Sequence, residues 1–153
     1  MDIAQLINEG IALCRDGNWN KGIERLSVAA DRKSSGEVSS LMYSFLGYGI
    51  AKFKGRRREG LALCEHAVKI EFYQPDNQLN LARTLMLNGN RKKAIEAVSR
   101  GLQIDPDHGE LIAMRKDMGS RRSPVFGFLG RNNFLNVLLG RLRHSLSSGS
   151  DKS

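Results

Sequence analysis

The sequence predicts an all-α fold, a solenoid of three helical hairpins followed by a capping helix and a C-terminal amphipathic helix. Three observations support this prediction. One spacing of glycines and small residues occurs three times, only three prolines interrupt the 153 residues, and apolar residues recur at helical intervals. Because a single hairpin cannot bury its own apolar face, neighbouring hairpins must cover it.

The repeat starts at a turn glycine, which stands at positions 17, 55 and 89. A small residue follows five positions on, an apolar residue nine on and a second small residue twelve on. These residues are Gly22, Leu26 and Ala29, then Gly60, Cys64 and Ala67, then Ala94, Val98 and Gly101. Glycine relieves the strain of a left-handed turn, and the small residue after it lets the second helix approach the first closely.

These segments resemble the tetratricopeptide-repeat (TPR) family over about residues 3 to 108. The resemblance also rests on small residues in the first helices, on leucines before two of them and on the end of the third unit: Gly10, Gly47, Ala82, Leu46, Leu81 and Asp105-Pro106. It implies a right-handed stack whose first helices line a concave groove. The tail in addition resembles those of small bacterial members of the family.

The elements follow in order along the chain. Asp2 is expected to cap a helix that ends at Arg15. The further predicted helices are Trp19 to Asp31, Glu37 to Lys54, Arg57 to Glu71, Asp76 to Leu87 and Arg91 to Ile104. A last helix, Asp107 to Met118, is expected to cap the array with a polar outer face, as repeat arrays require. Residues 1–118 are therefore expected to form one domain.

Residues 119–153 form a basic linker, an amphipathic helix and a polar end. No acidic residue occurs between Asp117 and Asp151. After Asn132 or Asn133, one apolar stripe is predicted to follow the helix: Phe134, Leu135, Leu138, Leu139, Leu142 and Leu146. Three interpretations stay open, because this helix could complete the core, dock a partner or second protomer, or lie on an anionic membrane.

No catalytic arrangement stands out. The three histidines are scattered, no Cys/His spacing suggests zinc, and no glycine loop suits a phosphate. We therefore expect no enzyme activity, no metal and no cofactor. Two cysteines, no secretory signal after Met1 and no spanning segment favour a cytoplasmic protein.

The resemblance implies which side chains line the groove. From the three first helices these are Asn8, Ile11, Arg15, Tyr48, Lys52, Asn80, Arg83 and Leu87. Arg15, Lys52 and Arg83 would form a row of cations, and the two asparagines could bond a peptide backbone. Charge-assisted hydrogen bonds to carboxylates are about twice as strong as neutral ones, which favours an acidic ligand.

The leading hypothesis is an interaction scaffold that binds an acidic or carboxylate-bearing segment of another protein in this groove. The net charge of +8 agrees with an acidic partner. The first alternative is electrostatic binding to nucleic acid or an anionic membrane through the tail and two basic turns, Arg56-Arg57-Arg58 and Arg91-Lys92-Lys93. The second is a small chaperone for an exported protein. The oligomeric state stays open.

Overall fold

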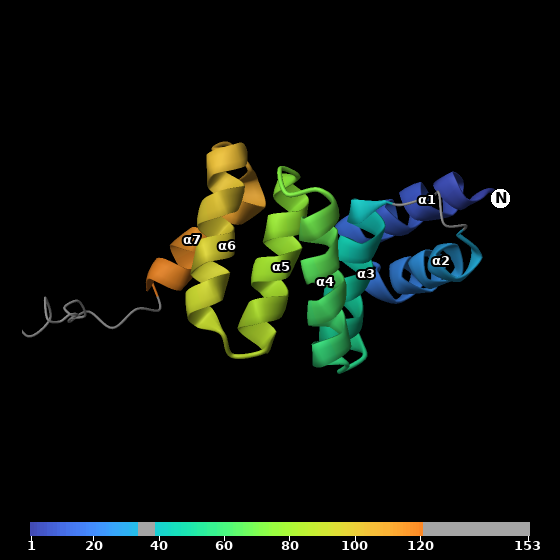
Figure 1. The fold of residues 1–153 in the computed structure, drawn as a ribbon, viewed down its shortest axis with the longest axis horizontal. Coiled ribbons are helices and arrows are strands. Elements are labelled where there is room, and N and C mark those ends of the chain that lie inside the picture. Colours follow the sequence, from blue (N-terminus) through green and yellow to red (C-terminus); the bar gives the residue numbers. More distant parts are fainter. Residues whose placement is uncertain (34–38, 121–153) are drawn as a thin grey trace, which may run out of the picture. The chain divides into compact units, whose positions relative to one another are not determined.

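The computed structural model describes residues 1–33 and 39–120, and over these residues it is entirely helical (Figure 1). The helices are α1 (Ile3–Arg15), α2 (Trp19–Arg32), α3 (Ser40–Phe53), α4 (Arg57–Ile70), α5 (Pro75–Leu87), α6 (Arg91–Ile104) and α7 (Gly109–Ser120). The all-α prediction is confirmed. The predicted amphipathic helix of the tail lies outside the described residues.

The chain divides into a first unit, Met1–Arg115, and a second unit that begins at Lys116. In the first unit α1–α2, α3–α4 and α5–α6 form successive antiparallel hairpins (Figure 1). Helix α3 contacts both α1 and α5, so the first helices of the three hairpins form one layer. None of the described helices is long and apolar enough to cross a membrane.

Side-chain caps determine where α1 and α3 begin. The Asp2 carboxylate accepts from the Gln5 N–H (2.8 Å), and the Gln5 side chain accepts from the Asp2 N–H (2.9 Å). This reciprocal capping box confirms the predicted start of the first helix. The Ser39 hydroxyl accepts from the Met42 N–H (3.2 Å). Helix α3 therefore starts at Ser40, three residues later than predicted.

The turns inside the three hairpins share a left-handed glycine, and the hydrogen bond that closes the second turn spans one residue more than in the other two. Each turn glycine lies in the left-handed region, with φ of 88° at Gly17, 71° at Gly55 and 77° at Gly89. The following residue donates its N–H to a carbonyl of the first helix, at 2.8 Å, 3.1 Å and 2.9 Å: Asn18 to Leu13, Arg56 to Ile50 and Asn90 to Leu85. The repeat predicted from glycine spacing is thus a repeat of backbone conformation.

Glycine also brings the two helices of the second hairpin into backbone contact. A Cβ added at Gly60 would lie 2.4 Å from the Gly47 carbonyl oxygen and 2.6 Å from the Ala51 Cβ. A Cβ at Gly47 would lie 2.7 Å from the Gly60 carbonyl oxygen. The predicted close approach of second helix to first is confirmed here, and it leaves no space for a side chain.

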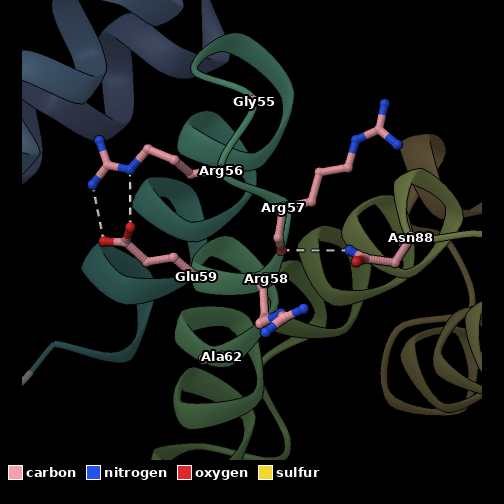
Figure 2. A pocket seen from close by; sticks show the side chains of 7 residues that line it. All are labelled: Gly55, Arg56, Arg57, Arg58, Glu59, Ala62 and Asn88. Atoms are coloured by element: carbon pink, nitrogen blue, oxygen red, sulfur yellow. Dashed lines mark hydrogen bonds and ion pairs between the residues drawn. The ribbon is translucent and has the colours of Figure 1, made fainter.

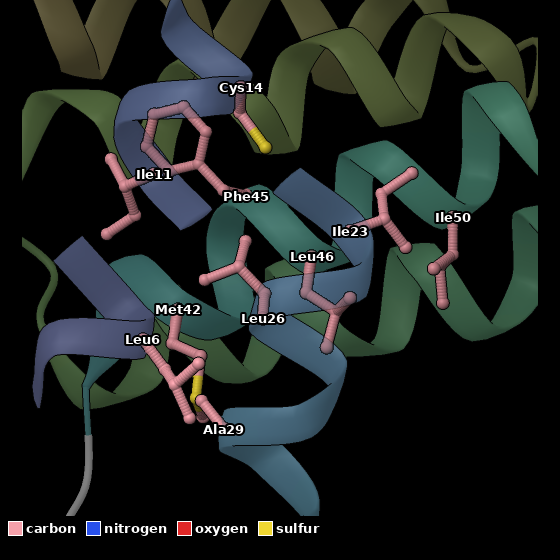
Figure 3. Packing of buried hydrophobic residues seen from close by; sticks show 10 residues of the cluster. All are labelled: Leu6, Ile11, Cys14, Ile23, Leu26, Ala29, Met42, Phe45, Leu46 and Ile50. Atoms are coloured by element: carbon pink, nitrogen blue, oxygen red, sulfur yellow. The ribbon is translucent and has the colours of Figure 1, made fainter. Parts of the chain in front are cut away.

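The apolar core of the first hairpin continues into α3. Leu26, Ala29 and Met42 are fully buried in it, and Figure 3 shows the cluster that they form with their neighbours. Ile11 and Phe45 belong to the same cluster. The first two hairpins therefore share one core, as a repeat array requires.

Buried amides join the second hairpin to the third. Asn77 Nδ2 donates to the Glu71 carbonyl (3.0 Å) and Gln78 Nε2 to the Phe72 carbonyl (3.1 Å). Both side chains are fully buried. Carbonyls at the end of α4 thus obtain the partners that water would otherwise supply, which allows the α4–α5 connection to pack tightly.

Asp76 links three parts of the first unit. Its carboxylate accepts from Arg15 of α1 and contacts His108 Nε2, ahead of α7, at 2.7 Å. Burial raises the pKa of Asp76, but the hydrogen bonds from His108 and Arg15 lower it, and the net pKa lies below its usual value. The ionised carboxylate therefore stabilises the fold.

We expect Gly60→Ala to destabilise the protein by about 2 kcal/mol, because the new Cβ meets backbone that cannot move aside. Gly109→Ala is the matched control, since nothing lies within 4 Å of a Cβ there. It should change stability by less than about 0.5 kcal/mol. Urea unfolding followed by circular dichroism measures both. Equal stability of the two variants would contradict the close backbone contact.

We expect Asp76→Asn to cost about 1–3 kcal/mol at neutral pH, because a charged acceptor of two hydrogen bonds is lost. The folded-state pKa is depressed, so this stabilisation is complete above the unfolded pKa of about 3.9. It disappears as the pH falls through the folded-state pKa. Urea unfolding of wild type and variant should therefore converge at low pH, whereas exposed Asp16→Asn should differ little throughout. A difference that is independent of pH would refute this role.

Candidate functional site

A pocket of about 150 Å³ opens among α1, α3, α5 and the start of α7. All of its lining belongs to the first unit: Cys14, Arg15, Gly17, Trp19, Phe45, Tyr48, Arg83 and Glu110. The layer of first helices brings these residues together from positions far apart in the sequence.

Two arginines and three aromatic rings define the chemistry of the pocket. The Arg15 guanidinium carbon lies 5.2 Å from the Phe45 ring centroid, and that of Arg83 lies 5.3 Å from the Tyr48 centroid. Trp19 contacts both rings, at centroid distances of 6.1 Å and 5.2 Å. Both guanidiniums lie within cation–π range, so the rings hold and orient the charges.

Each arginine already has an internal carboxylate partner. Arg15 pairs with Asp76, whose side chain is 14% exposed. Arg83 Nη2 lies 2.8 Å from Glu110 Oε2, and the Glu110 side chain is 64% exposed. Arg83 Nη1 also donates to Asn80 Oδ1 (3.2 Å). The pocket therefore carries balanced charge, and its two acids differ in how accessible they are to water.

The predicted groove residues fall into three groups: three line the pocket, three lie outside it, and the remaining two are buried in the interior. Arg15, Tyr48 and Arg83 line the pocket. Asn8 and Lys52 are exposed and Leu87 is partly buried, and none of these three is among the lining residues. Lys52 forms no ion pair within residues 1–33 and 39–120.

Ile11 and Asn80 do not lie on a groove surface, so their predicted placement is corrected. Ile11 is 5% exposed and packs in the shared core (Figure 3). Asn80 is fully buried, and its Nδ2 donates to Ser44 Oγ of α3 at 3.0 Å. Asn77, Asn80 and Thr84 share one face of α5 at helical spacing and are all buried. A prediction from polarity alone assigns such a stripe to solvent.

Five residues that line the pocket were not predicted from the sequence, and three of them contribute ring surface or charge. Trp19 and Phe45 supply ring surface, and Glu110 is the partner of Arg83. Trp19 could have been predicted from the sequence, because a large aromatic side chain directly after the first turn is unusual at the start of a helix. Glu110 could not have been predicted, since its partner is 27 residues away in the sequence.

A second charged feature lies at the α3–α4 turn (Figure 2). An open hollow of about 750 Å³ is lined by Gly55, Arg56, Arg57, Arg58, Glu59, Ala62 and Asn88. Arg56 Nε donates to Glu59 at 2.9 Å, and Asn88 Nδ2 donates to the Arg57 carbonyl at 3.5 Å. The Arg57 and Arg58 side chains project from the turn and have no ion-pair partner among the described residues.

Neither cysteine is placed for reactivity. Cys14 and Cys64 are buried free thiols, and burial raises the pKa of each to about 12. Both therefore remain protonated at neutral pH and behave as small apolar side chains. Within the part of the chain that the structure describes, no group of three or more His, Cys, Asp and Glu could hold a metal ion.

Comparison with known proteins yields structural likeness without sequence relatives. No family model matches the sequence, and no curated protein does. A structure of UNC-45, a chaperone that binds and folds muscle myosin, matches with a TM-score of 0.62 and 13% identity. That match covers 78% of this chain but only 13% of the UNC-45 chain.

Two smaller structures match over most of their own length. The first TPR of Spaghetti (RPAP3), bound to the HSP90 peptide SRMEEVD, has a TM-score of 0.61 and 12% identity, over 77% of this chain and 90% of that one. PcrH in complex with the chaperone binding region of PopB has a TM-score of 0.56 and 13% identity, over 77% and 92%. Identities this low establish fold alone. The chain therefore has the fold of a tetratricopeptide-repeat domain.

Proposed function

We propose that the chain is a protein-interaction scaffold that binds an acidic peptide segment at the pocket among α1, α3 and α5. The observation that carries the proposal is the pair of arginines, Arg15 and Arg83, each held over an aromatic ring at a single pocket. A guanidinium presents planar, paired N–H donors that match a carboxylate.

The rings make this recognition efficient. An arginine restrained by an aromatic face loses less conformational entropy when a ligand binds, so more of the interaction energy remains as affinity. Trp19 and Tyr48 also offer apolar surface to a neighbouring side chain of the ligand. A volume of about 150 Å³ suits one or two side chains and not a large cofactor.

The similar structures support a peptide ligand. The RPAP3 domain was solved with SRMEEVD, a peptide with three acidic residues and one basic residue. PcrH was solved with a segment of PopB. The second complex also supports the chaperone alternative, which differs from the scaffold in the fate of the partner and not in the chemistry of binding.

We propose a cytoplasmic location for this activity. The two cysteines are free thiols, and neither is placed to pair with the other within the described core. Thiols that remain unpaired are typical of a reducing compartment.

The test is a peptide array in which each acidic peptide, SRMEEVD among them, is paired with a C-terminally amidated analogue that carries Gln and Asn in place of Glu and Asp. We expect wild type to prefer the acidic members. Arg83→Ala should weaken their binding by about 5–10-fold, which corresponds to roughly 1 kcal/mol, and should leave the analogues unaffected.

Lys69→Glu is the control, because Lys69 is exposed and does not line the pocket. It changes the net charge by more than Arg83→Ala does, so it corrects for general electrostatic attraction. If wild type binds acidic peptides and their analogues equally, the proposal fails.

We further propose, as a second candidate, electrostatic binding of duplex nucleic acid at the α3–α4 turn. Support comes from the open hollow in which Arg57 and Arg58 lack ion-pair partners among the described residues. Ala62 is the single apolar side chain of its lining, so this hollow offers little to insert into a bilayer. It also has no aromatic platform for the bases of a single strand.

For this candidate we expect duplex DNA binding to weaken steeply between about 50 and 200 mM salt. Arg57→Glu/Arg58→Glu should reduce the slope of log affinity against log salt by about 2, one per lost phosphate contact. Fluorescence anisotropy measures the slope, with exposed Lys21→Glu/Lys69→Glu as the charge-matched control. An equal slope in both double variants, or tighter binding to anionic vesicles than to DNA, would rule the candidate out.

A further inference from the structure

The two ion pairs of the pocket have different physical characters. Asp76 is 14% exposed and has two partners, Arg15 and His108. Glu110 is 64% exposed, and the one hydrogen bond that its side chain forms within the described residues is to Arg83. Exposed ion pairs contribute little to stability, whereas a buried carboxylate with two donors is costly to displace. The Glu110 carboxylate can therefore be exchanged for another, and that of Asp76 cannot.

Arg83 keeps its position without Glu110. Its guanidinium lies over Tyr48, and its Nη1 donates to Asn80 Oδ1. Asn80 is itself fixed, because it is fully buried and donates to Ser44 Oγ. These contacts hold the Arg83 guanidinium in place independently of Glu110. The donor that bonds to Glu110 is Nη2. A carboxylate that replaced Glu110 would meet a guanidinium already in place.

Glu110 loses little when it is displaced. It is the second residue of α7, where the helix dipole favours a negative side chain even in the absence of a partner. Its exposure also allows water to solvate the released carboxylate. The exchange of one carboxylate for another at Arg83 is therefore close to balanced, and small differences decide which one occupies the site.

We propose that Arg83 Nη2, with the Tyr48 ring beside it, forms a carboxylate subsite in which Glu110 acts as the internal occupant that a ligand carboxylate must displace. This inference rests on the proposed function, since it concerns the pocket proposed to bind acidic peptides. Glu110 is then a specificity-determining residue. A peptide without a carboxylate leaves the Arg83–Glu110 pair intact, and only a peptide that carries one gains Arg83.

The ligand carboxylate can come from an Asp or Glu side chain or from the C-terminus of a peptide. Both present the same two oxygens, so the subsite accepts either. SRMEEVD with an amidated C-terminus tests the terminal source, and its analogue with Gln and Asn and a free C-terminus tests the side-chain source. The peptide whose affinity does not change when the Glu110 charge is removed lacks the carboxylate that binds Arg83. That peptide therefore identifies the source.

The decisive variant is Glu110→Gln, which keeps the size of the side chain and removes the competing charge. We expect it to bind SRMEEVD about 3–10-fold more tightly than wild type, as measured by fluorescence anisotropy of the labelled peptide. Glu96→Gln is the matched control, because Glu96 is exposed, lies on α6 and does not line the pocket. It removes the same charge and should change the affinity by less than about 2-fold.

A double-mutant cycle assigns the gain to Arg83. In the Arg83→Ala background, Glu110→Gln should no longer improve binding, because there is no cation left for the two carboxylates to share. Persistence of the gain in that background, or an equal gain with Glu96→Gln, overturns the inference. Thermal unfolding of Glu110→Gln should match that of wild type, and a large loss of stability would likewise overturn the inference by showing that Glu110 is structural.

The results separate this inference from the proposed function. If SRMEEVD binding depends on Arg83 and Glu110→Gln leaves it unchanged, the exchange at Glu110 is wrong and the peptide-binding proposal stands. If the peptide binds the Glu110→Gln variant and not wild type, the inference is supported. The Glu110 carboxylate then competes with the ligand strongly enough to prevent binding. If no acidic peptide binds wild type or Glu110→Gln, both proposals fail together.

Discussion

The backbone contact between α3 and α4 at Gly47 and Gly60 is the constraint on which the rest of the first unit depends. With no side chain between them, these helices approach until a carbonyl oxygen of one touches the α-carbon region of the other. Helix α3 is thereby drawn into a position where it packs against α1 and α5 as well as α4. The pocket forms along this layer, since most of its lining side chains come from α1, α3 and α5.

Packing between hairpins uses a different chemistry from packing within them. Between α3 and α5 the contacts include the buried side chains of Ser44 and Asn80, and Asn77 and Gln78 bind the carbonyls after α4. Apolar surfaces slide against one another at little cost, whereas hydrogen bonds have preferred directions and fix the register. Asn80 therefore links the fold to the site, because the same amide that aligns α5 with α3 also orients Arg83.

The sequence predicted the helices well because glycine position is a local property. A left-handed turn favours glycine and a close helix contact requires glycine or alanine, and both leave a spacing that can be counted. Helical faces were predicted less well. Arg15, Tyr48 and Arg83 meet as expected, but Ile11 and Asn80 are buried, because their environment depends on which neighbouring helix covers them. Glu110 could not be predicted, since a salt bridge across 27 residues leaves no pattern in the chain.

Net charge is a poor guide to where this protein can attract an acidic ligand. Arg15 and Arg83 line the pocket, yet internal carboxylates already neutralise them at short range. Arg57, Arg58 and Lys52 are exposed cations without such partners in the described part of the chain, and they contribute to the long-range field. Attraction and discrimination are thus carried by different residues. Unpaired cations raise the rate of encounter with any anion and are screened by salt, whereas in the proposed exchange Arg83 responds only to a carboxylate that can replace Glu110.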